Sequence, residues 1–407
     1  MQNKFVKVKD HHFLINGKPY YYVGANYWYG GILGTTSEGK LRVKKELDFL
    51  LSKGVTNLRI LAAAEGEGLI NGKNRVKPAY QIAQGVFDEN NIKGLDFLLV
   101  EMGKRNLKAV IYFGNNWEWS GGFLQYLNWN NLLPDSIMQR KLTWDENRDY
   151  VSNFYSSKES VDAYNVQILK IVNRVNSISG KSYKNDKTIM AWELANEPRP
   201  MRPIAVENFI KWNLETSAMI KKADKHHLVT TGSEGEMGSN DMAVFKEVHA
   251  SPNLDYATIH IWPKNWGWFK DTSINKSLEQ IKKNASQYII KHQIVLRNLN
   301  KPLVLEEFGL PRDLQSYQLG SPVANRDHYF NFILNMWMVS KKTNDVLAGC
   351  NFWAFGGLGR PQQGTHFWKE GADLLGDPPQ EEQGLNSVFN NDTSTWKIIE
   401  SFTKKNK

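Results

Sequence analysis

Apolar positions along this chain follow two alternating spacings. Val43, Leu47, Leu50 and Leu51 share one face of a helix, and Gly54 follows as a stop signal. The stretch 108–113 is instead almost continuously apolar, as in a strand that is buried on both faces. The pattern predicts strands at 20–26, 55–60, 108–113, 188–194, 228–231, 256–260, 303–305 and 347–354, and helices near 43–51, 95–102, 159–176, 205–223, 241–248, 277–298 and 325–340.

Eight strands with helices between them indicate an α/β fold of the (β/α)8 TIM barrel type. The stretch 1–19 is predicted to form an N-terminal β-hairpin, and 20–407 the barrel, within a single domain over 1–407. An open doubly wound sheet is the alternative. A nucleotide-binding sheet of that type typically has a glycine-rich phosphate-binding turn after an early strand, and the sequence contains no such turn.

The additional length lies in the connections that follow strands. The stretches 61–91, 114–158, 261–276 and 354–392 are long and rich in Trp, Gly, Asn and Pro. In a barrel these connections form the C-terminal face, where active sites are found. Compact domains seldom carry several such loops without a functional reason.

Composition narrows the possible partners. Aromatic residues make up 12%, with 14 Trp, which suits stacking on sugar rings, although most Trp are expected in the core. The net charge of +9 comes from scattered Lys and Arg, so a solvated surface is favoured over a nucleic-acid groove. Cys350 is the single cysteine, and the sequence contains neither a membrane-spanning apolar run nor a visible signal peptide.

Two carboxylates carry the predicted chemistry. Glu197 follows the fourth predicted strand and Glu307 follows the seventh, so both are expected at the same rim of the barrel. A retaining glycosidase needs two such groups about 5 Å apart, one to protonate the leaving oxygen and one to attack the anomeric carbon. His, Cys and carboxylate residues show no metal-ligand spacing, and this mechanism requires neither a metal nor a cofactor.

Glu307 has a neighbouring competitor, Glu306. Side chains alternate along a strand, so only one of the two is expected to point into the barrel mouth. Glu193 is interpreted as an inward or packing residue, not as the acid. For Glu234, loop anchoring and substrate contact both stay open.

Motifs in strand order resemble glycoside hydrolase family 5 of clan A. They are Asn196-Glu197-Pro198 and Glu307-Phe308-Gly309, with Arg59, His260 and Trp353 at further strand ends. The resemblance implies Glu197 as acid/base and Glu307 as nucleophile. It also implies that Arg59 pairs with the nucleophile, that Asn196 and His260 hold sugar hydroxyls, and that Trp353 stacks beneath the reacting sugar.

Further segments are similar to bacterial endo-β-1,4-mannanases within this family. They are 115–122, 260–266, 376–379 and 382–389. Trp262 departs from the family pattern, which has Tyr at that position. The resemblance and the loop positions add Trp117, Trp119, Trp262 and Arg360 as expected substrate-binding residues.

The expected function is a retaining endo-β-1,4-mannanase acting on mannan, glucomannan or galactomannan. An exo-acting β-mannosidase and a β-1,4-glucanase are alternatives from the same family. A catalytically dead sugar-binding barrel is less favoured, because both glutamates are present. We expect a monomer that is extracellular or periplasmic, the location being inferred from the polymeric substrate alone.

Overall fold

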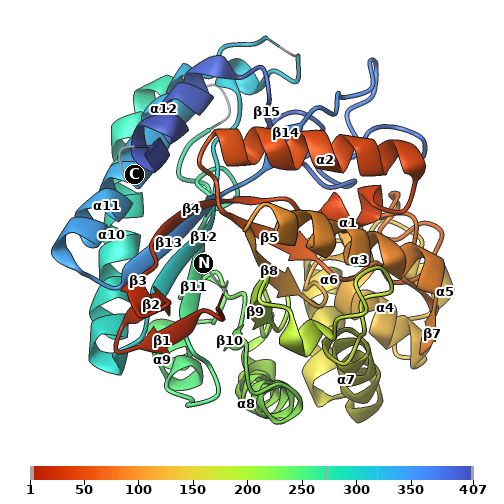
Figure 1. Cartoon of the computed structure of the whole chain (residues 1–407). Coiled ribbons are helices and arrows are strands. Elements are labelled where there is room, and N and C mark those ends of the chain that lie inside the picture. Colours follow the sequence, from red (N-terminus) through yellow and green to blue (C-terminus); the bar gives the residue numbers. More distant parts are fainter. Residues whose placement is uncertain (1–3, 271–272, 319, 405–407) are drawn as a thin grey trace.

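The computed structural model describes residues 4–270, 273–318 and 320–404. Its centre is a parallel sheet of eight strands in the order β10-β9-β8-β5-β4-β13-β12-β11, surrounded by helices (Figure 1). The strands are β4 (Tyr22–Asn26), β5 (Asn57–Leu61), β8 (Lys108–Tyr112), β9 (Ile189–Glu193), β10 (Leu228–Thr230), β11 (Ala257–Ile261), β12 (Leu303–Phe308) and β13 (Leu347–Phe352). The predicted barrel architecture and all eight predicted strands are confirmed.

The two end strands of this sheet, β10 and β11, close the barrel without a ladder between them. Isolated hydrogen bonds join them instead. The Asp255 amide donates to the Val229 carbonyl at 2.8 Å, and the His260 amide donates to the Glu234 carbonyl at 3.1 Å. We call this junction the β10–β11 seam.

Helices cover the outside of the strands. They are α2 (Ser37–Ser52), α3 (Glu89–Lys104), α7 (Lys158–Val172), α8 (Val206–Ala223), α9 (Met242–His249), α10 (Ile274–Leu299), α11 (Ala324–Thr343) and α12 (Thr393–Thr403). The pattern predicted all of these except α12, which packs beside α11 after the long 354–392 connection. Side-chain caps fix several starts: Thr36 accepts from the Gly39 amide at 3.0 Å at the beginning of α2.

The long connections contain elements that periodicity did not predict. The short helix α1 (Gly30–Leu33) follows β4. The later connections contain the hairpin of β6 (Gln81–Ala83) and β7 (Val86–Phe87), and the helices α4 (Gly122–Trp129), α5 (Asp135–Met138) and α6 (Trp144–Ser152). The last long connection contains the strand pair β14 (Phe355–Gly357) and β15 (Val388–Phe389). Short 3-10 turns are η1 (Glu118–Ser120), η2 (Phe154–Ser156), η3 (Tyr183–Asn185), η4 (Pro203–Ala205) and η5 (Asp313–Gln315).

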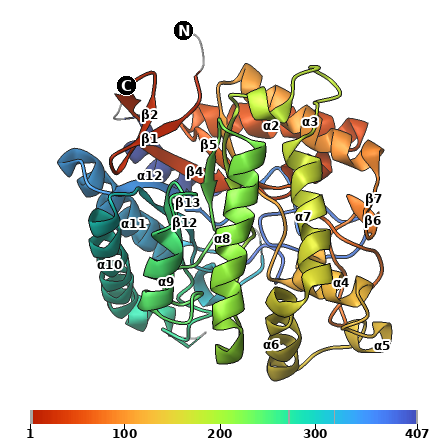
Figure 2. The ribbon, with the colours of Figure 1, turned by 90° about the horizontal axis from the view of Figure 1, so that it is seen from below.

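A small antiparallel sheet covers one end of the barrel. It consists of β1 (Lys7–Lys9), β2 (His12–Ile15) and β3 (Lys18–Pro19), one strand more than the predicted hairpin. Phe13 is buried and meets Tyr256 edge-to-face, with ring centroids 5.1 Å apart. Figure 2 shows this sheet at one end of the molecule and α5 and α6 at the other. Residues 1–3, which belong to the predicted hairpin and to the signal-peptide prediction, lie outside the described residues.

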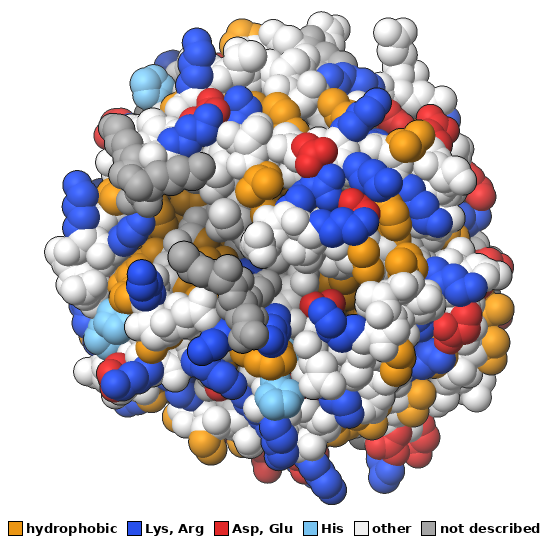
Figure 3. Space-filling model, in the orientation of Figure 1, with side chains coloured by type: hydrophobic (Ala, Val, Ile, Leu, Met, Phe, Trp, Pro, Cys, Tyr) orange, Lys and Arg blue, Asp and Glu red, His pale blue; other side chains and the backbone are white. Residues whose placement is uncertain are grey.

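The face that carries this sheet is rich in positive charge. Figure 3 shows Lys and Arg side chains spread over it, with acidic and uncharged side chains between them. Within the described part of the chain, no helix combines the length and the hydropathy that crossing a bilayer requires.

An irregularity in β12 places two successive glutamates. On the β11 side, Ile259 lies opposite Leu305 and His260 lies opposite Glu307, so Glu306 is an additional residue in β12. A bulge of this kind interrupts the alternation of side chains along a strand. Glu306 and Glu307 therefore both face the barrel interior, where each approaches Arg59. Of the two, only Glu307 lines the cavity at the barrel mouth, as expected, whereas Glu306 lies in the interior beside Arg59.

Candidate active site

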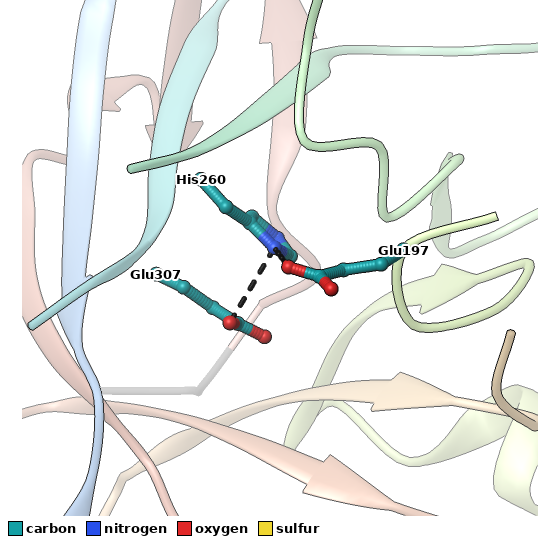
Figure 4. A group of neighbouring side chains, drawn as sticks. All are labelled: Glu197, His260 and Glu307. Carbon is teal, nitrogen blue, oxygen red and sulfur yellow. Dashed lines mark hydrogen bonds and ion pairs between the residues drawn. The ribbon is translucent and has the colours of Figure 1, made fainter. Parts of the chain in front are cut away.

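Glu197 and Glu307 face each other at the C-terminal rim of the barrel. Glu197 follows β9, and its φ of 51° lies in the left-handed region that favours glycine. Such backbone strain of about 1–3 kcal/mol is typical of functional sites. One carboxylate oxygen of each glutamate and a ring nitrogen of His260 lie within 4.8 Å of one another (Figure 4). This separation agrees with the spacing of a retaining glycosidase pair.

Glu307 is surrounded by donors. The Arg59 guanidinium forms an ion pair with one of its oxygens. The Trp262 indole Nε1 donates to the other oxygen at 3.0 Å. The residue that replaces the family Tyr thus supplies a hydrogen bond to the expected nucleophile.

The Arg59 guanidinium is held by hydrogen bonds, ion pairs and a ring contact. Its Nε donates to Glu193 at 3.0 Å, and its Nη2 donates to the Asn196 side-chain oxygen at 2.7 Å. The guanidinium also lies over the Tyr112 ring at 4.5 Å. Arg59 is completely buried, so it acts on the carboxylates and does not line the cavity.

Glu197 has two partners. The Trp117 Nε1 donates to one of its oxygens, and the His260 Nδ1 lies 2.7 Å from the other. Figure 4 shows the His260 ring pointing toward both carboxylates. The His260 ring is buried behind Glu197 and Glu307, and its Nδ1 is 3.5 Å from Glu307, so this geometry does not support the prediction that His260 holds a sugar hydroxyl.

Burial raises the pKa of Glu197, and burial together with the facing Glu197 charge raises the pKa of Glu307. Two carboxylates this close do not both ionise readily, so the pair retains a proton. The Arg59 ion pair and the Trp262 N–H favour the charged form of Glu307. We therefore assign the shared proton to Glu197.

A cavity of about 630 Å³ opens above these carboxylates. Its lining includes the predicted residues Trp117, Trp119, Asn196, Trp262 and Trp353 together with both glutamates. The Trp262 and Trp353 rings meet edge-to-face at 5.9 Å and form one wall. Asn196 already bonds Arg59 and donates to Asn115 at 3.1 Å, and the second hydrogen of its amide is oriented by these bonds for a ligand.

Comparison with known proteins identifies this arrangement. The beta-mannosidase-like model of glycoside hydrolase family 5 matches residues 3–407. The chain belongs to this family. It is 32% identical over 372 residues to mannan endo-1,4-beta-mannosidase 4 of Solanum lycopersicum, covering 88% of this chain and 84% of that protein. It is 28% identical over 364 residues to a putative mannan endo-1,4-beta-mannosidase 4 of Arabidopsis thaliana, covering 86% and 82%.

Solved structures of family 5 agree with the fold. The family 5 mannosidase from Rhizomucor miehei matches with a TM-score of 0.88 and 33% identity, over 99% of this chain and 98% of that chain. A further structure of that enzyme is a complex with mannosyl-fructose, at a TM-score of 0.87. The endo-1,4-beta-mannanase from the same organism shares the fold, with a TM-score of 0.68 and 23% identity over 99% of both chains. The chain is thus a family 5 hydrolase.

Arg360, another residue predicted to bind substrate in this family 5 chain, also lies outside the cavity. Arg360 donates to the Gly359 carbonyl and to the Asn390 side chain, each at 2.7 Å, and lies over the Phe389 ring at 5.4 Å. These contacts fasten the two ends of the 354–392 connection together. Arg360 therefore does not reach the cavity in this structure, and the geometry does not support a contact with a sugar.

Several cavity residues were not predicted from the sequence. They include Asn71, Lys73, Trp144, Arg199, Gln380 and Glu381. Arg199 pairs with Glu234 and lies over the Trp117 ring at 5.1 Å, so Glu234 both anchors a loop and lines the cavity. For these residues, the only indication in the sequence of a place near the site was the position of Arg199, two residues after Glu197.

The cluster in Figure 4 also offers the donor types of a metal site, since Glu197, His260 and Glu307 each supply one ligand atom. The surrounding contacts favour a different use. Glu307 is paired with Arg59, and Glu197 accepts from Trp117. We interpret the cluster as a pair of carboxyl groups arranged for proton transfer and nucleophilic attack.

Proposed function

We propose that the protein is a retaining β-mannosidase that removes single mannose units from the ends of short β-1,4-mannosides. The beta-mannosidase-like family model supports the mannoside substrate, as does the mannosyl-fructose complex of the Rhizomucor miehei enzyme. The two facing carboxylates support the retaining chemistry.

In the proposed mechanism Glu307 attacks the anomeric carbon while Glu197 donates its proton to the departing oxygen. A covalent mannosyl–enzyme forms, and the shortened acceptor leaves. Glu197, now a carboxylate, takes a proton from water, and the resulting hydroxide oxygen displaces Glu307. Arg59 and Trp262 stabilise the Glu307 carboxylate before attack and after release.

Exo action is supported by a bridge between two long loops, and this observation carries the proposal. The Gln380 side-chain nitrogen donates to the carbonyls of Ile70 and Asn74, each at 3.3 Å. The Lys73 Nζ donates to the Gln380 carbonyl at 3.1 Å. We call this the loop bridge. It joins the connection after β5 to the connection after β13 where both line the cavity.

The position of the loop bridge decides which end of a substrate it would block. In the strand order of the barrel, β13 stands four positions from β9, on the opposite side from Glu197. The leaving group departs on the side of the acid/base, Glu197, and we infer that Gln380, on the β13 side, closes the opposite, sugar-donating end. The other half of the loop bridge comes from the connection after β5, two strand positions from β9, where Asn71 donates to Glu118. A cavity closed behind one sugar admits a chain end and excludes the middle of a polymer.

An endo-β-1,4-mannanase, the function expected from the sequence, is the second candidate. It is favoured by the names of the curated relatives, which are mannan endo-1,4-beta-mannosidases. Export to the periplasm or the medium belongs with this second candidate, because a mannan polymer does not enter a cell.

Product analysis distinguishes the candidates. Purified protein would be incubated separately with mannotetraose, linear β-1,4-mannan and a soluble cellulose derivative, and products followed over time. We expect mannose as the sole early product from mannotetraose, with the viscosity of mannan solutions unchanged. A spread of manno-oligosaccharides with a rapid fall in viscosity would establish endo action, and hydrolysis of the cellulose derivative alone would overturn the mannoside assignment.

A further inference from the structure

Trp144 is a large aromatic residue that the fold leaves exposed. It is the first residue of α6 and is 53% exposed, whereas most aromatic residues of the chain are buried. It lines the same cavity as the two catalytic carboxylates. Its ring stacks on Trp117, with centroids 6.1 Å apart and planes 27° from parallel. One side of the indole is thus supported and much of the rest is open to the cavity.

The position of Trp144 is fixed by contacts that do not involve its ring. Thr143 and Glu146 form a reciprocal capping box, with bonds of 3.2 and 2.8 Å, so α6 begins at Trp144. Arg202, from the connection after β9, donates to Asp149 of α6 at 2.7 Å. The same connection carries Glu197. Two independent contacts therefore hold the exposed indole at a set place relative to the acid/base.

Trp144 lies on the leaving-group side of the cavity. Trp117, against which it stacks, donates its Nε1 to Glu197, the group that protonates the departing oxygen. A sugar that follows the cleaved bond would extend from Glu197 past Trp117 toward Trp144.

We propose that Trp144 is the stacking platform for the leaving-group sugar, and that its ligand is the pyranose ring of a β-linked mannosyl or glucosyl residue. The axial C–H bonds of a pyranose form an apolar face that matches an exposed indole. The proposal rests on the proposed function. It adds that the enzyme prefers oligosaccharide leaving groups to leaving groups that lack a ring.

The test compares two substrates that differ only in the leaving group. β-1,4-Mannobiose departs as a sugar, whereas β-mannosyl fluoride departs as a fluoride ion and cannot stack. In Trp144→Ala we expect kcat/KM for mannobiose to fall about five- to tenfold, as for loss of one aromatic contact. We expect the value for mannosyl fluoride to stay within about twofold, since the glycosyl transfer machinery is unchanged.

Controls separate stacking from structural damage. Trp144→Phe should recover most of the mannobiose rate. Leu132→Ala removes an apolar side chain that is 45% exposed in the same inserted connection and outside the cavity lining, and should change neither substrate. An equal loss on both substrates in Trp144→Ala, or no loss on mannobiose, would overturn the proposal.

Binding provides a measurement that is independent of turnover. In a Glu307→Ala background, Trp144→Ala should weaken mannobiose binding about five- to tenfold in calorimetric titration. Binding of mannose alone should not change. If the parent enzyme hydrolysed neither substrate, the proposed function would fail, while unchanged mannobiose affinity in this background would overturn the Trp144 platform by itself.

Discussion

Trp262 stands where the resemblance to family 5 leads us to expect Tyr, and its indole donates a hydrogen bond to Glu307, the proposed nucleophile. An N–H donor to a carboxylate stabilises the charged form and lowers the pKa of that group. Trp262 donates to Glu307 at 3.0 Å while Arg59 holds the other oxygen. The indole therefore assists Arg59 in keeping Glu307 ionised against burial and the facing Glu197.

Replacing Trp262 by Phe removes this donor and keeps an aromatic ring against Trp353. The pKa of Glu307 should then rise, because the charged carboxylate loses a hydrogen bond. Activity in acid would be lost at a higher pH, so the acidic limb of the kcat/KM profile should move upward. The measurement is a pH–rate profile with an aryl β-mannoside. Trp262→Tyr restores a donor and serves as the matched control; an acidic limb that stays in place in Trp262→Phe would contradict this role.

Variants of Glu197 and Glu307 should lose activity to different extents on different substrates, which distinguishes the roles of the two residues. Glu197→Ala should lower kcat/KM for mannobiose about 10²- to 10⁴-fold, the usual contribution of a general acid. With an activated aryl mannoside, which needs no protonation, added azide should restore turnover and yield β-mannosyl azide. In Glu307→Ala, azide can take the place of the missing carboxylate, so any azide product from an aryl β-mannoside should have the α configuration. An α-azide product from Glu197→Ala, or full activity of Glu307→Ala without azide, would reverse these assignments.

Residue types at strand ends were sufficient to predict the two glutamates, Arg59 and Trp353. Side-chain direction was not predictable at His260 and Arg360. His260 lies opposite Glu307 across a register shift between β11 and β12, and sequence periodicity does not reveal a single additional residue in a strand. Arg360 is retained by Asn390, 30 residues further along, through a contact between two irregular segments.

Among the elements, those with regular spacing were predicted and those within long polar connections were not. The eight strands and the outer helices other than α12 follow from runs and faces of apolar residues. The helices α4, α5 and α6 lie in the 114–158 connection and pack on one another, on η1 and η2 and, through α4, on the outer helix α7. The loop bridge joins residues that are about 310 positions apart, for which local pattern carries no signal.

Weakening the loop bridge should change the product pattern. Gln380→Ala removes the side-chain bonds to the Ile70 and Asn74 carbonyls and loosens the closed end of the cavity. We expect mannobiose to appear beside mannose from mannotetraose, with kcat/KM lowered about three- to tenfold. Chromatography of early products is the measurement. Lys77→Ala breaks an exposed ion pair to Glu370 between the same two loops and should have no effect; identical products from both variants would count against the exo proposal.

At the scale of the whole molecule, buried ionisable groups couple folding to pH. Glu65 is completely buried below the 114–122 loop, where it accepts from the Gly122 amide at 3.2 Å. Burial raises its pKa to about 8. The folded chain therefore binds a proton that the unfolded chain releases above about pH 4.3. Between these values the contribution of Glu65 to the free energy of unfolding falls by up to about 1.4 kcal/mol for each pH unit.

Glu65→Gln removes this titration and keeps the shape of the neutral carboxyl. The free energy of unfolding of the variant, relative to the parent, should increase as the pH rises from 5 to 8 and level off above the folded pKa. Urea denaturation at pH 5, 6.5 and 8 measures the difference. A difference that is the same at all three values would show that Glu65 does not titrate in this range.

The β10–β11 seam affects how the enzyme loses activity when it is heated. Every other neighbouring pair in the barrel shares a ladder, whereas the seam is held by isolated bonds, one of them from the His260 amide to the Glu234 carbonyl. Amide hydrogens of β10 and β11 should therefore exchange with deuterium sooner than those of β8 and β9. Since His260 lies beside both catalytic carboxylates, opening of the seam would stop turnover while most of the barrel remains folded. Thermal inactivation should then occur several degrees below the unfolding transition, and slow cooling from that interval should restore activity.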